Sequence, residues 1–241
     1  MKVGTDGVLL GAWTPIHNSQ CTMHNAQFRI LDVGTGSGLI ALMLAQRCPE
    51  AEIEAIDIDE AAVEQARENV KRAQTAAQTD RFADRIQTYH ARLQEWKGGP
   101  YDLIVSNPPY FQNSLKNPDK GRQTARHTDS LSYEELIRHC ARLLAKGGQL
   151  ALILPAEAET EVRGLAAAEK LTLTRITRVY SKESKPAKRT LMAFVRTQTA
   201  TLTDRFADRA QTDLQEDTLV LEDEKGGRSA AYSELCKDFY L

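Results

Sequence analysis

The tetrapeptide Asn107-Pro108-Pro109-Tyr110 combines residue types that can hold a planar group bearing an NH2. An Asn side-chain oxygen accepts a hydrogen bond from an amino group. Pro109 fixes its own φ and keeps Pro108 out of the α region, so the Pro108 carbonyl has a set direction and can accept a second hydrogen bond. Tyr110 offers an aromatic face for stacking. The motif predicts a clamp for a planar amino-bearing substrate, although a strand end followed by a Pro-Pro turn has the same residues.

A second candidate site lies upstream of this clamp. The sequence DVGTGSG holds an acid and three alternating glycines: Asp32, Gly34, Gly36 and Gly38. The apolar run 28–33 predicts a strand and 39–48 has helical periodicity, so the glycines form the turn between them. Glycines permit positive φ and let a ligand approach the backbone closely. Leu39 stands where the redox dinucleotide pattern has its third glycine, which favours an adenosyl ligand other than NAD or FAD.

An acid at the end of the second predicted strand could bind a ribose. Residues 52–57 form an apolar run that ends at Asp57. A carboxylate can accept hydrogen bonds from two ribose hydroxyls, and this is where such folds place one. Asp59 is better explained as the N-cap of the helix predicted over 60–73.

Asp6 lies in the N-terminal stretch MKVGTDGVLLGAW and has two interpretations. In the first, Thr5 or Asp6 caps a helix that ends before Pro15. In the second, the stretch is a loop that brings Asp6 near a bound cofactor. Single capping residues are much commoner than ligands, and the residues alone leave both interpretations open.

Two segments are rich in basic residues. The long polar loop 111–130 contains Lys116, Lys120, Arg122, Arg126 and His127. The hairpin predicted from strands 171–180 and 190–196 has a second group around its turn: Lys182, Lys185, Lys188 and Arg189. Such residues either form a solvated surface or contact the phosphates of a nucleic acid.

Composition sets limits on the class of protein. Hydrophobic residues make up 41% of the 241 residues and charged residues 27%, which predicts a soluble domain with a sizeable core. The formal charge of −2 excludes non-specific nucleic-acid binding by the whole chain, so any such contact must come from local patches. The four cysteines form no CxxC pair or zinc pattern, which predicts no metal and free thiols in a reducing cytoplasm. We see no signal peptide and no run of membrane-spanning length, so we expect no membrane contact.

The remaining apolar runs complete the predicted fold. They predict strands at 86–90, 101–106 and 149–154. Ser132 and Glu135 form a capping box that opens a helix to about residue 145, and Gly147-Gly148 ends it. A further helix is predicted over 156–170.

The order of these motifs resembles that of Rossmann-like S-adenosylmethionine-dependent methyltransferases with a (D/N/S)PP(Y/F) motif. The resemblance implies an α/β fold with a mostly parallel seven-stranded sheet, an antiparallel last strand and a C-terminal extension. It also implies S-adenosyl-L-methionine as cofactor. Asp32 and the three glycines would frame its methionine part, and Asp57 would bind its ribose. Asn107 would lie against both cofactor and target, and Tyr110 would hold the target ring.

Within this class the chain resembles the bacterial tRNA(Val) adenine-37 N(6)-methyltransferase family. The stretches that carry the resemblance are MKVGTDGVLLGAW, NPPYF, Ala125–Thr128, Lys185-Pro186 with Arg189, and Lys237–Leu241. The resemblance implies methyl transfer to the N(6) amino group of a tRNA adenine, with the two basic segments on the RNA. We expect a monomer in the cytoplasm. Where these enzymes often carry an Asp near the cofactor adenine, this chain has His90-Ala91-Arg92, so that contact stays unassigned.

The expected organisation has three parts. Residues 1–27 form a segment that closes over the cofactor, 28–198 the methyltransferase domain, and 199–241 an extension packed on that domain. Two rival functions stay open. The same clamp fits a glutamine side-chain amide or an amino group of rRNA or DNA. A cofactor-binding module without catalysis is the other rival, and the intact NPPY motif argues against it.

Overall fold

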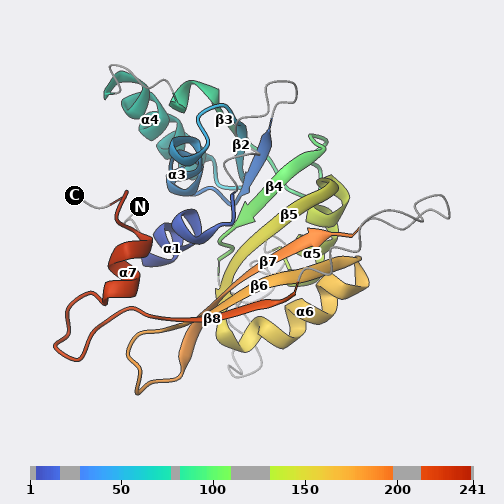
Figure 1. The fold of residues 1–241 in the computed structure, drawn as a ribbon. Coiled ribbons are helices and arrows are strands. Elements are labelled where there is room, and N and C mark those ends of the chain that lie inside the picture. Colours follow the sequence, from blue (N-terminus) through green and yellow to red (C-terminus); the bar gives the residue numbers. More distant parts are fainter. Residues whose placement is uncertain (1–3, 17–27, 77–81, 110–130, 198–212, 240–241) are drawn as a thin grey trace, which may run out of the picture.

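The computed structural model describes residues 4–16, 28–76, 82–109, 131–197 and 213–239. These residues form an α/β structure in which one twisted sheet has helices on both faces (Figure 1). The eight described strands lie in the order β3-β2-β1-β4-β5-β7-β6-β8. The predicted α/β fold is therefore confirmed, with one strand more than the seven expected.

The elements have the following bounds. The strands are β1 (Arg29–Val33), β2 (Glu52–Asp57), β3 (Ile86–His90), β4 (Tyr101–Ser106), β5 (Leu144–Pro155), β6 (Leu171–Tyr180), β7 (Ala187–Arg196) and β8 (Gln215–Val220). The helices are α1 (Thr5–Trp13), α3 (Leu39–Arg47), α4 (Glu60–Ala76), α5 (Tyr133–Leu143), α6 (Glu159–Ala168) and α7 (Ala230–Leu235). Short 3₁₀ turns cover Phe82–Arg85 and Ala156–Ala158.

Strand direction follows the prediction for the first seven strands. Neighbours from β3 through β5 pair in parallel, and β7 runs antiparallel to both β5 and β6. A parallel sheet needs crossover connections. Helices α3, α4 and α5 supply three of them, and residues 91–100 connect β3 to β4 without a helix. All carboxyl ends from β3 to β5 therefore face one edge of the sheet.

The C-terminal extension, for which the sequence predicted no strand, contributes the eighth strand of the sheet. β8 pairs in parallel with β6 at the outer edge of the sheet. Its carboxylates neutralise the basic strand beside it: Asp217 lies 3.4 Å from Arg175 and Glu216 lies 3.2 Å from Arg178. The sequence QEDTLV has no regular apolar alternation, so the usual strand signal was missing.

The core has two halves, one on each face of the sheet. On one face α1, α3 and α7 cover β1, β5 and β7, with α1 lying between α3 and α7 (Figure 1). On the other face α5 and α6 pack on residues that include Ile104, Leu152 and Met192. The C-terminal residues were expected to be docked, and Tyr232 and Cys236 of the extension are buried in the first half.

Helix starts agree with the capping signals in most places. The Ser132–Glu135 capping box is present at α5, and Asp59 accepts from the Ala61 N–H at 3.0 Å to cap α4. At α1 the prediction is wrong, because the N-cap is Gly4 and neither Thr5 nor Asp6 caps the helix. The helix nevertheless ends before Pro15, as predicted.

Gly147-Gly148 was predicted to end the helix that precedes β5, and this is also wrong. The helix ends at Leu143, and both glycines lie within a bulged start of β5. A Cβ atom on Gly148 would lie 2.8 Å from the Tyr101 carbonyl oxygen, so the close approach of β4 requires a glycine there.

Two of the cysteines, Cys140 and Cys236, are buried free thiols. Cys48 is disulfide-bonded, so the expectation that all four thiols are free is wrong. Among the described helices none is long and apolar enough to cross a membrane.

A hydrogen-bonded chain at the amino end of the sheet leads to a prediction about stability. Trp96 Nε1 donates to the Tyr101 hydroxyl at 2.7 Å, and that hydroxyl donates to Glu54 at 2.6 Å. A Cβ atom on Gly98 would overlap the Tyr101 hydroxyl and lie 2.5 Å from Trp96 Nε1. Because Tyr101 is fully buried, its ring has no room to move away. We expect Gly98→Ala to lower the free energy of unfolding by about 1–3 kcal/mol, measured by urea denaturation.

Gly164→Ala is the matched control for this experiment. A Cβ atom at Gly164 of α6 would meet nothing within 4 Å. This substitution should be neutral or stabilise the protein by about 0.5–1 kcal/mol through helix propensity. Equal stability of the two variants would contradict the packing argument.

Candidate functional site

The candidate site lies where the carboxyl ends of β1 and β4 meet. Val33 and Ser106 are register partners in this parallel pair, and the Ser106 hydroxyl donates to the Val33 carbonyl at 2.8 Å. From β1 the chain proceeds outward to β2 and β3, and from β4 it proceeds the other way to β5. Such a switch point leaves a crevice beyond the strand ends where ligands bind in α/β sheets. The glycine turn after Val33 and Asn107 after Ser106 are thereby placed side by side.

The glycine turn has the backbone that its sequence requires. Gly34, Gly36 and Gly38 have φ of 71°, 57° and 78°, a region that side chains disfavour. A Cβ atom on Gly34 would meet nothing within 4 Å, so the turn has open space in front of it. At Gly38 a Cβ atom would lie 3.2 Å from that of Ala66, so this glycine serves the packing of α3 against α4.

Asp32 is fully buried behind the turn. One of its oxygens, Oδ2, accepts a hydrogen bond from the Thr35 hydroxyl at 2.7 Å. The other, Oδ1, is buried and has no hydrogen-bond partner among the described residues. Burial raises the pKa of Asp32 to about 7. Hydrogen bonding to Thr35 and to the Ala41 backbone opposes this rise, and the charge of Asp57 adds to it. Thr35 was not singled out from the sequence, although its place inside the glycine turn was a usable signal.

Asp57 connects the end of β2 to the glycine turn. Its Oδ2 accepts from the Gly36 N–H at 2.9 Å, and its Oδ1 accepts from the Asp59 N–H at 3.0 Å. The Ile56 carbonyl also receives the N–H groups of Gly34 and Thr35, at 2.9 and 3.0 Å. Each carboxylate oxygen keeps a second lone pair, so Asp57 can still accept hydrogen bonds from two hydroxyls.

Ile58 lies beside the candidate site and was not singled out from the sequence. It is 42% exposed, one of the two exposed large hydrophobic side chains among the described residues. Its carbonyl is 2.9 Å from His90 Nε2, which ties the end of β2 to the end of β3. An exposed apolar side chain directly after Asp57 offers a surface for a flat ring. The signal in the sequence was the apolar residue between Asp57 and Asp59.

Asn107 and Pro108 occupy the position predicted for a substrate clamp. Asn107 is partly exposed, Pro108 is buried and Pro109 is exposed. The Asn107 side chain forms no hydrogen bond with another residue in the described part of the chain. Its amide oxygen can therefore accept from a bound group. Tyr110, the third predicted clamp residue, lies outside the described residues.

Asp6 lies in the first turn of α1, beside the glycine turn. A Cβ atom on the adjacent Gly7 would lie 3.2 Å from Leu39 Cδ2, so the two helix starts are in close contact. The Asp6 carboxylate accepts from Arg189 Nε at 2.9 Å. Asp6 is thus near the site, as one interpretation of the sequence expected, but it belongs to a helix and not to a loop.

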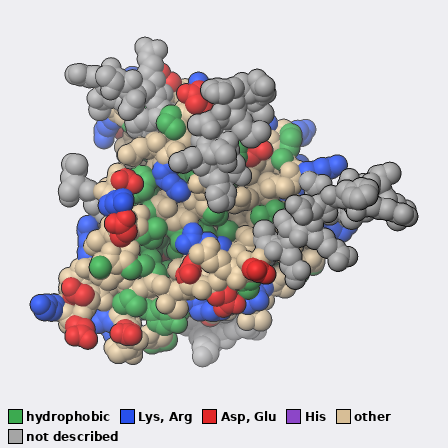
Figure 2. All heavy atoms as spheres, in the orientation of Figure 1, with side chains coloured by type: hydrophobic (Ala, Val, Ile, Leu, Met, Phe, Trp, Pro, Cys, Tyr) green, Lys and Arg blue, Asp and Glu red, His purple; other side chains and the backbone are tan. Residues whose placement is uncertain are grey.

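The predicted RNA-binding residues fall into three groups. The first group lies outside the described residues: Lys116, Lys120, Arg122, Arg126 and His127. Lys182 and Arg189 are in ion pairs, with Glu222 at 3.5 Å and Asp6 at 2.9 Å. Lys185 and Lys188 are exposed and form no ion pair with other described residues. Figure 2 shows acidic and basic side chains interspersed on the face it draws, without one large basic patch.

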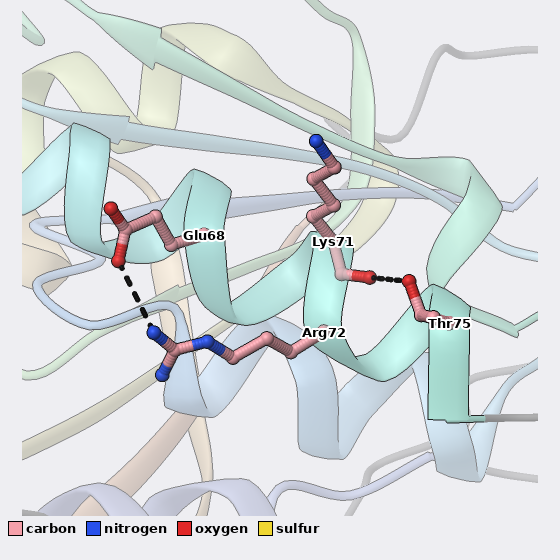
Figure 3. Close-up of a pocket in the computed structure, with 4 residues that line it drawn as sticks. All are labelled: Glu68, Lys71, Arg72 and Thr75. Atoms are coloured by element: carbon pink, nitrogen blue, oxygen red, sulfur yellow. Dashed lines mark hydrogen bonds and ion pairs between the residues drawn. The ribbon is translucent and has the colours of Figure 1, made fainter.

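A shallow hollow on α4 lies away from this site. Its lining residues all come from α4: Glu68, Lys71, Arg72 and Thr75 (Figure 3). Glu68 pairs with Arg72 at 3.5 Å, and the Thr75 hydroxyl donates to the Lys71 carbonyl at 2.8 Å, so the hollow is part of a solvated helix face. Among the described residues no group of three or more His, Cys, Asp or Glu side chains could hold a metal ion.

Comparison with known proteins identifies the class. The family described as "Methyltransferase small domain" matches residues 19–175, so the chain is a methyltransferase of this family. Among solved structures, a predicted O-methyltransferase from Agrobacterium tumefaciens superposes with a TM-score of 0.67 at 19% identity, covering 96% of this chain and 95% of that one. A ribosomal protein L11 methylase from Lactobacillus delbrueckii has a TM-score of 0.51 at 18% identity, covering 80% and 78%. These two likenesses concern the fold alone.

Curated relatives narrow the class further. A protein of Parabacteroides distasonis is 44% identical over 244 residues, and one of Bacteroides fragilis is 41% identical over 241. In each case the match covers 100% of this chain and 91% of the relative. Both relatives carry the name tRNA1(Val) (adenine(37)-N6)-methyltransferase. The chain belongs to this family, as the sequence resemblance indicated.

The buried acid behind the glycine turn predicts a pH dependence of stability. In the unfolded chain the pKa of Asp32 is about 3.9, whereas folding raises it to about 7. Between these values the folded protein holds a proton that the unfolded chain has released, so stability falls as the pH rises. We expect the free energy of unfolding to fall between pH 5 and 7 by up to about 3 kcal/mol through this group.

Asp32→Asn removes the titrating carboxyl and keeps an oxygen that can accept from Thr35. The free energy of unfolding of this variant should therefore change less over the same pH range. Urea denaturation at several pH values makes the measurement. Glu68→Gln, an exposed change on α4, should keep the wild-type profile. Parallel profiles for wild type and Asp32→Asn would contradict the raised pKa.

Proposed function

We propose that the protein transfers a methyl group from S-adenosyl-L-methionine to the N(6) amino group of an adenine in tRNA, adenine 37 of tRNA(Val). The observation that supports it most is the partly exposed Asn107, followed by Pro108, next to the glycine turn at the β1–β4 switch point. The names of the full-length relatives support the choice of tRNA.

The residues around the glycine turn fit an adenosyl cofactor. Gly34 leaves open space at the backbone, and the methionine part would lie there, with Asp32, Gly36 and Gly38 shaping the turn. Asp57 would accept from the ribose hydroxyls, and the exposed Ile58 side chain would pack on the adenine ring. This assignment gives the adenine a contact that the sequence left unassigned. The cofactor supplies an electrophilic methyl group on a sulfonium.

Asn107 and Pro108 act on the nucleophile. The lone pair of the adenine N(6) is delocalised into the ring, so the planar amino group attacks poorly. If the Asn107 oxygen and the Pro108 carbonyl each accept one N(6) hydrogen, the nitrogen can become pyramidal with its lone pair aimed at the methyl group. Pro109 keeps the Pro108 carbonyl in place. The Tyr110 ring would stack on the base, which is unpaired or flipped out.

Transfer itself needs alignment more than acid–base chemistry. With the cofactor bound, the nitrogen lone pair would form the new C–N bond, and the C–S bond would break with its electrons left on sulfur. The proton leaves the methylated nitrogen for solvent, so no strong base is required. Holding the two reactants in line is therefore the main contribution of the protein.

The clamp is tested with Asn107→Ala. We expect this variant to lose methyl transfer by at least about a hundredfold, because alignment of the amino group is lost. Its affinity for S-adenosylhomocysteine should stay near the wild-type value, since the glycine turn and Asp57 are intact. The assay incubates unmodified tRNA(Val) with cofactor and detects N(6)-methyladenosine by nucleoside mass spectrometry. Thr75→Ala on the outer face of α4 is the control.

Near-normal turnover of Asn107→Ala would remove Asn107 from the mechanism. Wild-type protein that binds the cofactor but methylates no tRNA would remove the substrate proposal. Glutamine-bearing proteins would then be tested, since a side-chain amide presents the same NH2.

The β6–β7 hairpin supports an RNA substrate over a protein. It projects beyond the body of the sheet (Figure 1), and it starts after Tyr180 at the edge where β5 also ends. Lys185 and Lys188 are exposed on it, so they can meet phosphates without breaking an ion pair with described residues. The residues of 111–130 would add to this surface; their role rests on the sequence alone.

Replacing Lys185 and Lys188 by Met tests this surface. We expect a higher KM for tRNA and a salt dependence of binding that falls by about one unit of log–log slope per lysine. Cofactor affinity should not change. Lys71→Met, an exposed lysine on α4, is the matched control and should leave both quantities unaltered (Figure 3). If the salt dependence of tRNA binding were unchanged in the double variant, these two lysines would not contact the RNA.

We also propose that the protein works as a monomer in the cytoplasm, where tRNA is modified. Residues 28–198 would carry the reaction, and 1–27 would close over the cofactor. Gly7 and Gly11 let α1 pack closely against α3, and this supports the closing role of residues 1–27. Residues 199–241 would extend the domain, in line with the pairing of β8 on β6.

A further inference from the structure

Two residues that the sequence assigned to different ligands form one ion pair. Asp6, expected near the cofactor, and Arg189, expected on the RNA, lie 2.9 Å apart through Oδ2 and Nε. Their side chains are 23% and 28% exposed, so the pair is partly shielded from solvent and is screened less than a surface pair. The pair joins two segments that are far apart in the chain.

On one side, the pair is attached to the wall of the cofactor site. Asp6 precedes Gly7, whose missing side chain lets α1 approach Leu39 at the start of α3. Gly11, one turn further on, faces Met43 in the same way, because a Cβ atom there would lie 2.7 Å from the Met43 sulfur. The first turn of α1 therefore lies directly beside the start of α3, which follows Gly38.

On the other side, the pair is attached to the sheet. Arg189 is the register partner of Pro155 at the end of β5 and of Val179 on β6. Its Nη1 also donates to the Lys188 carbonyl at 2.9 Å, which orients the guanidinium at the carboxyl edge. The backbone of Arg189 is thus fixed by a strand on each side. The first turn of α1 lacks such support, because its N-cap Gly4 provides no side-chain cap.

The same arginine lies close to the start of α5. Burial and the charges of Glu161 and Glu157 raise the pKa of Tyr133, and the positive charge of Arg189 opposes that rise. Tyr133 is the first residue of α5, on the opposite face of the sheet from α1. Arg189 therefore stands between the two helix starts that border the carboxyl edge.

We infer that Arg189 is a positioning residue for cofactor binding, which it supports through Asp6 and not by touching the cofactor. The ion pair holds the uncapped first turn of α1 against the glycine turn and α3. Without it, that turn loses its side-chain link to β7, and the wall of the cofactor site is held less firmly. This inference rests on the proposed function, because it requires that the glycine turn binds S-adenosylmethionine.

The test measures S-adenosylhomocysteine affinity by isothermal titration calorimetry. We expect Arg189→Met and Asp6→Asn each to raise Kd by about fivefold or more. The Kd of the double variant for S-adenosylhomocysteine should be no higher than that of the single variant with the lower affinity, because both changes remove the same interaction. Arg189→Lys keeps a cation within reach and should recover part of the affinity. At saturating cofactor and tRNA, kcat of Arg189→Met should stay near wild type, so that the loss appears in KM for the cofactor.

Arg178→Met is the matched control. Arg178 also bridges to carboxylates, 2.7 Å from Glu159 and 3.2 Å from Glu216, but on β6 away from the glycine turn. It should leave the Kd for S-adenosylhomocysteine unchanged even if it lowers stability. A loss of affinity in Arg178→Met equal to that in Arg189→Met would overturn the inference, since general destabilisation would then explain both.

Two further outcomes separate this inference from the proposed function. If wild type methylates tRNA and Arg189→Met, Asp6→Asn and Arg189→Lys all bind S-adenosylhomocysteine as wild type does, the inference is wrong and the proposed function stands. If wild type binds no S-adenosylhomocysteine, the proposed function fails and the inference fails with it. Additive losses in the double variant would also overturn the inference, because the two residues would then act separately.

Discussion

The parallel pairing of β1 with β4 is the contact on which the candidate site depends. Val33 and Ser106 are partners in that ladder, and the Ser106 hydroxyl bonds to the Val33 carbonyl. Because both strands end at the same level and the chain departs from them in opposite directions, the glycine turn and Asn107 meet beyond their ends. A shift of one residue in this register would turn the side chains of β4 to the other face and misplace the clamp.

The second strand fixes the shape of the turn. The Ile56 carbonyl and the Asp57 carboxylate together receive the N–H groups of Gly34, Thr35 and Gly36. A turn held in this way by its neighbour is formed before a ligand arrives, so little conformational entropy is lost on binding. Asp32 remains buried behind it with one oxygen unpartnered among the described residues, and that costs stability at neutral pH.

Within the described part of the chain, charge is distributed so that few cations near the site are unpaired. β8 supplies carboxylates to the basic strand β6, and Arg189 is paired with Asp6. Among the described predicted RNA-binding residues, the exposed ones that remain are Lys185 and Lys188 on the hairpin. In a protein of formal charge −2, these two lysines are the exposed cations that the hairpin offers.

The sequence by itself determined which motif follows which strand. DVGTGSG follows the first strand, Asp57 ends the next, and Asn107-Pro108 follows a later one. Local patterns suffice there, because strands, capping boxes and glycine turns depend on neighbouring residues. Only the tertiary structure decided that Asp6 pairs with Arg189, that β8 joins the sheet and that Ile58 stays exposed. These depend on contacts between segments distant in the chain, and no local periodicity encodes them. Gly147-Gly148 makes the same point, since what requires a glycine at position 148 is the carbonyl of Tyr101 on another strand.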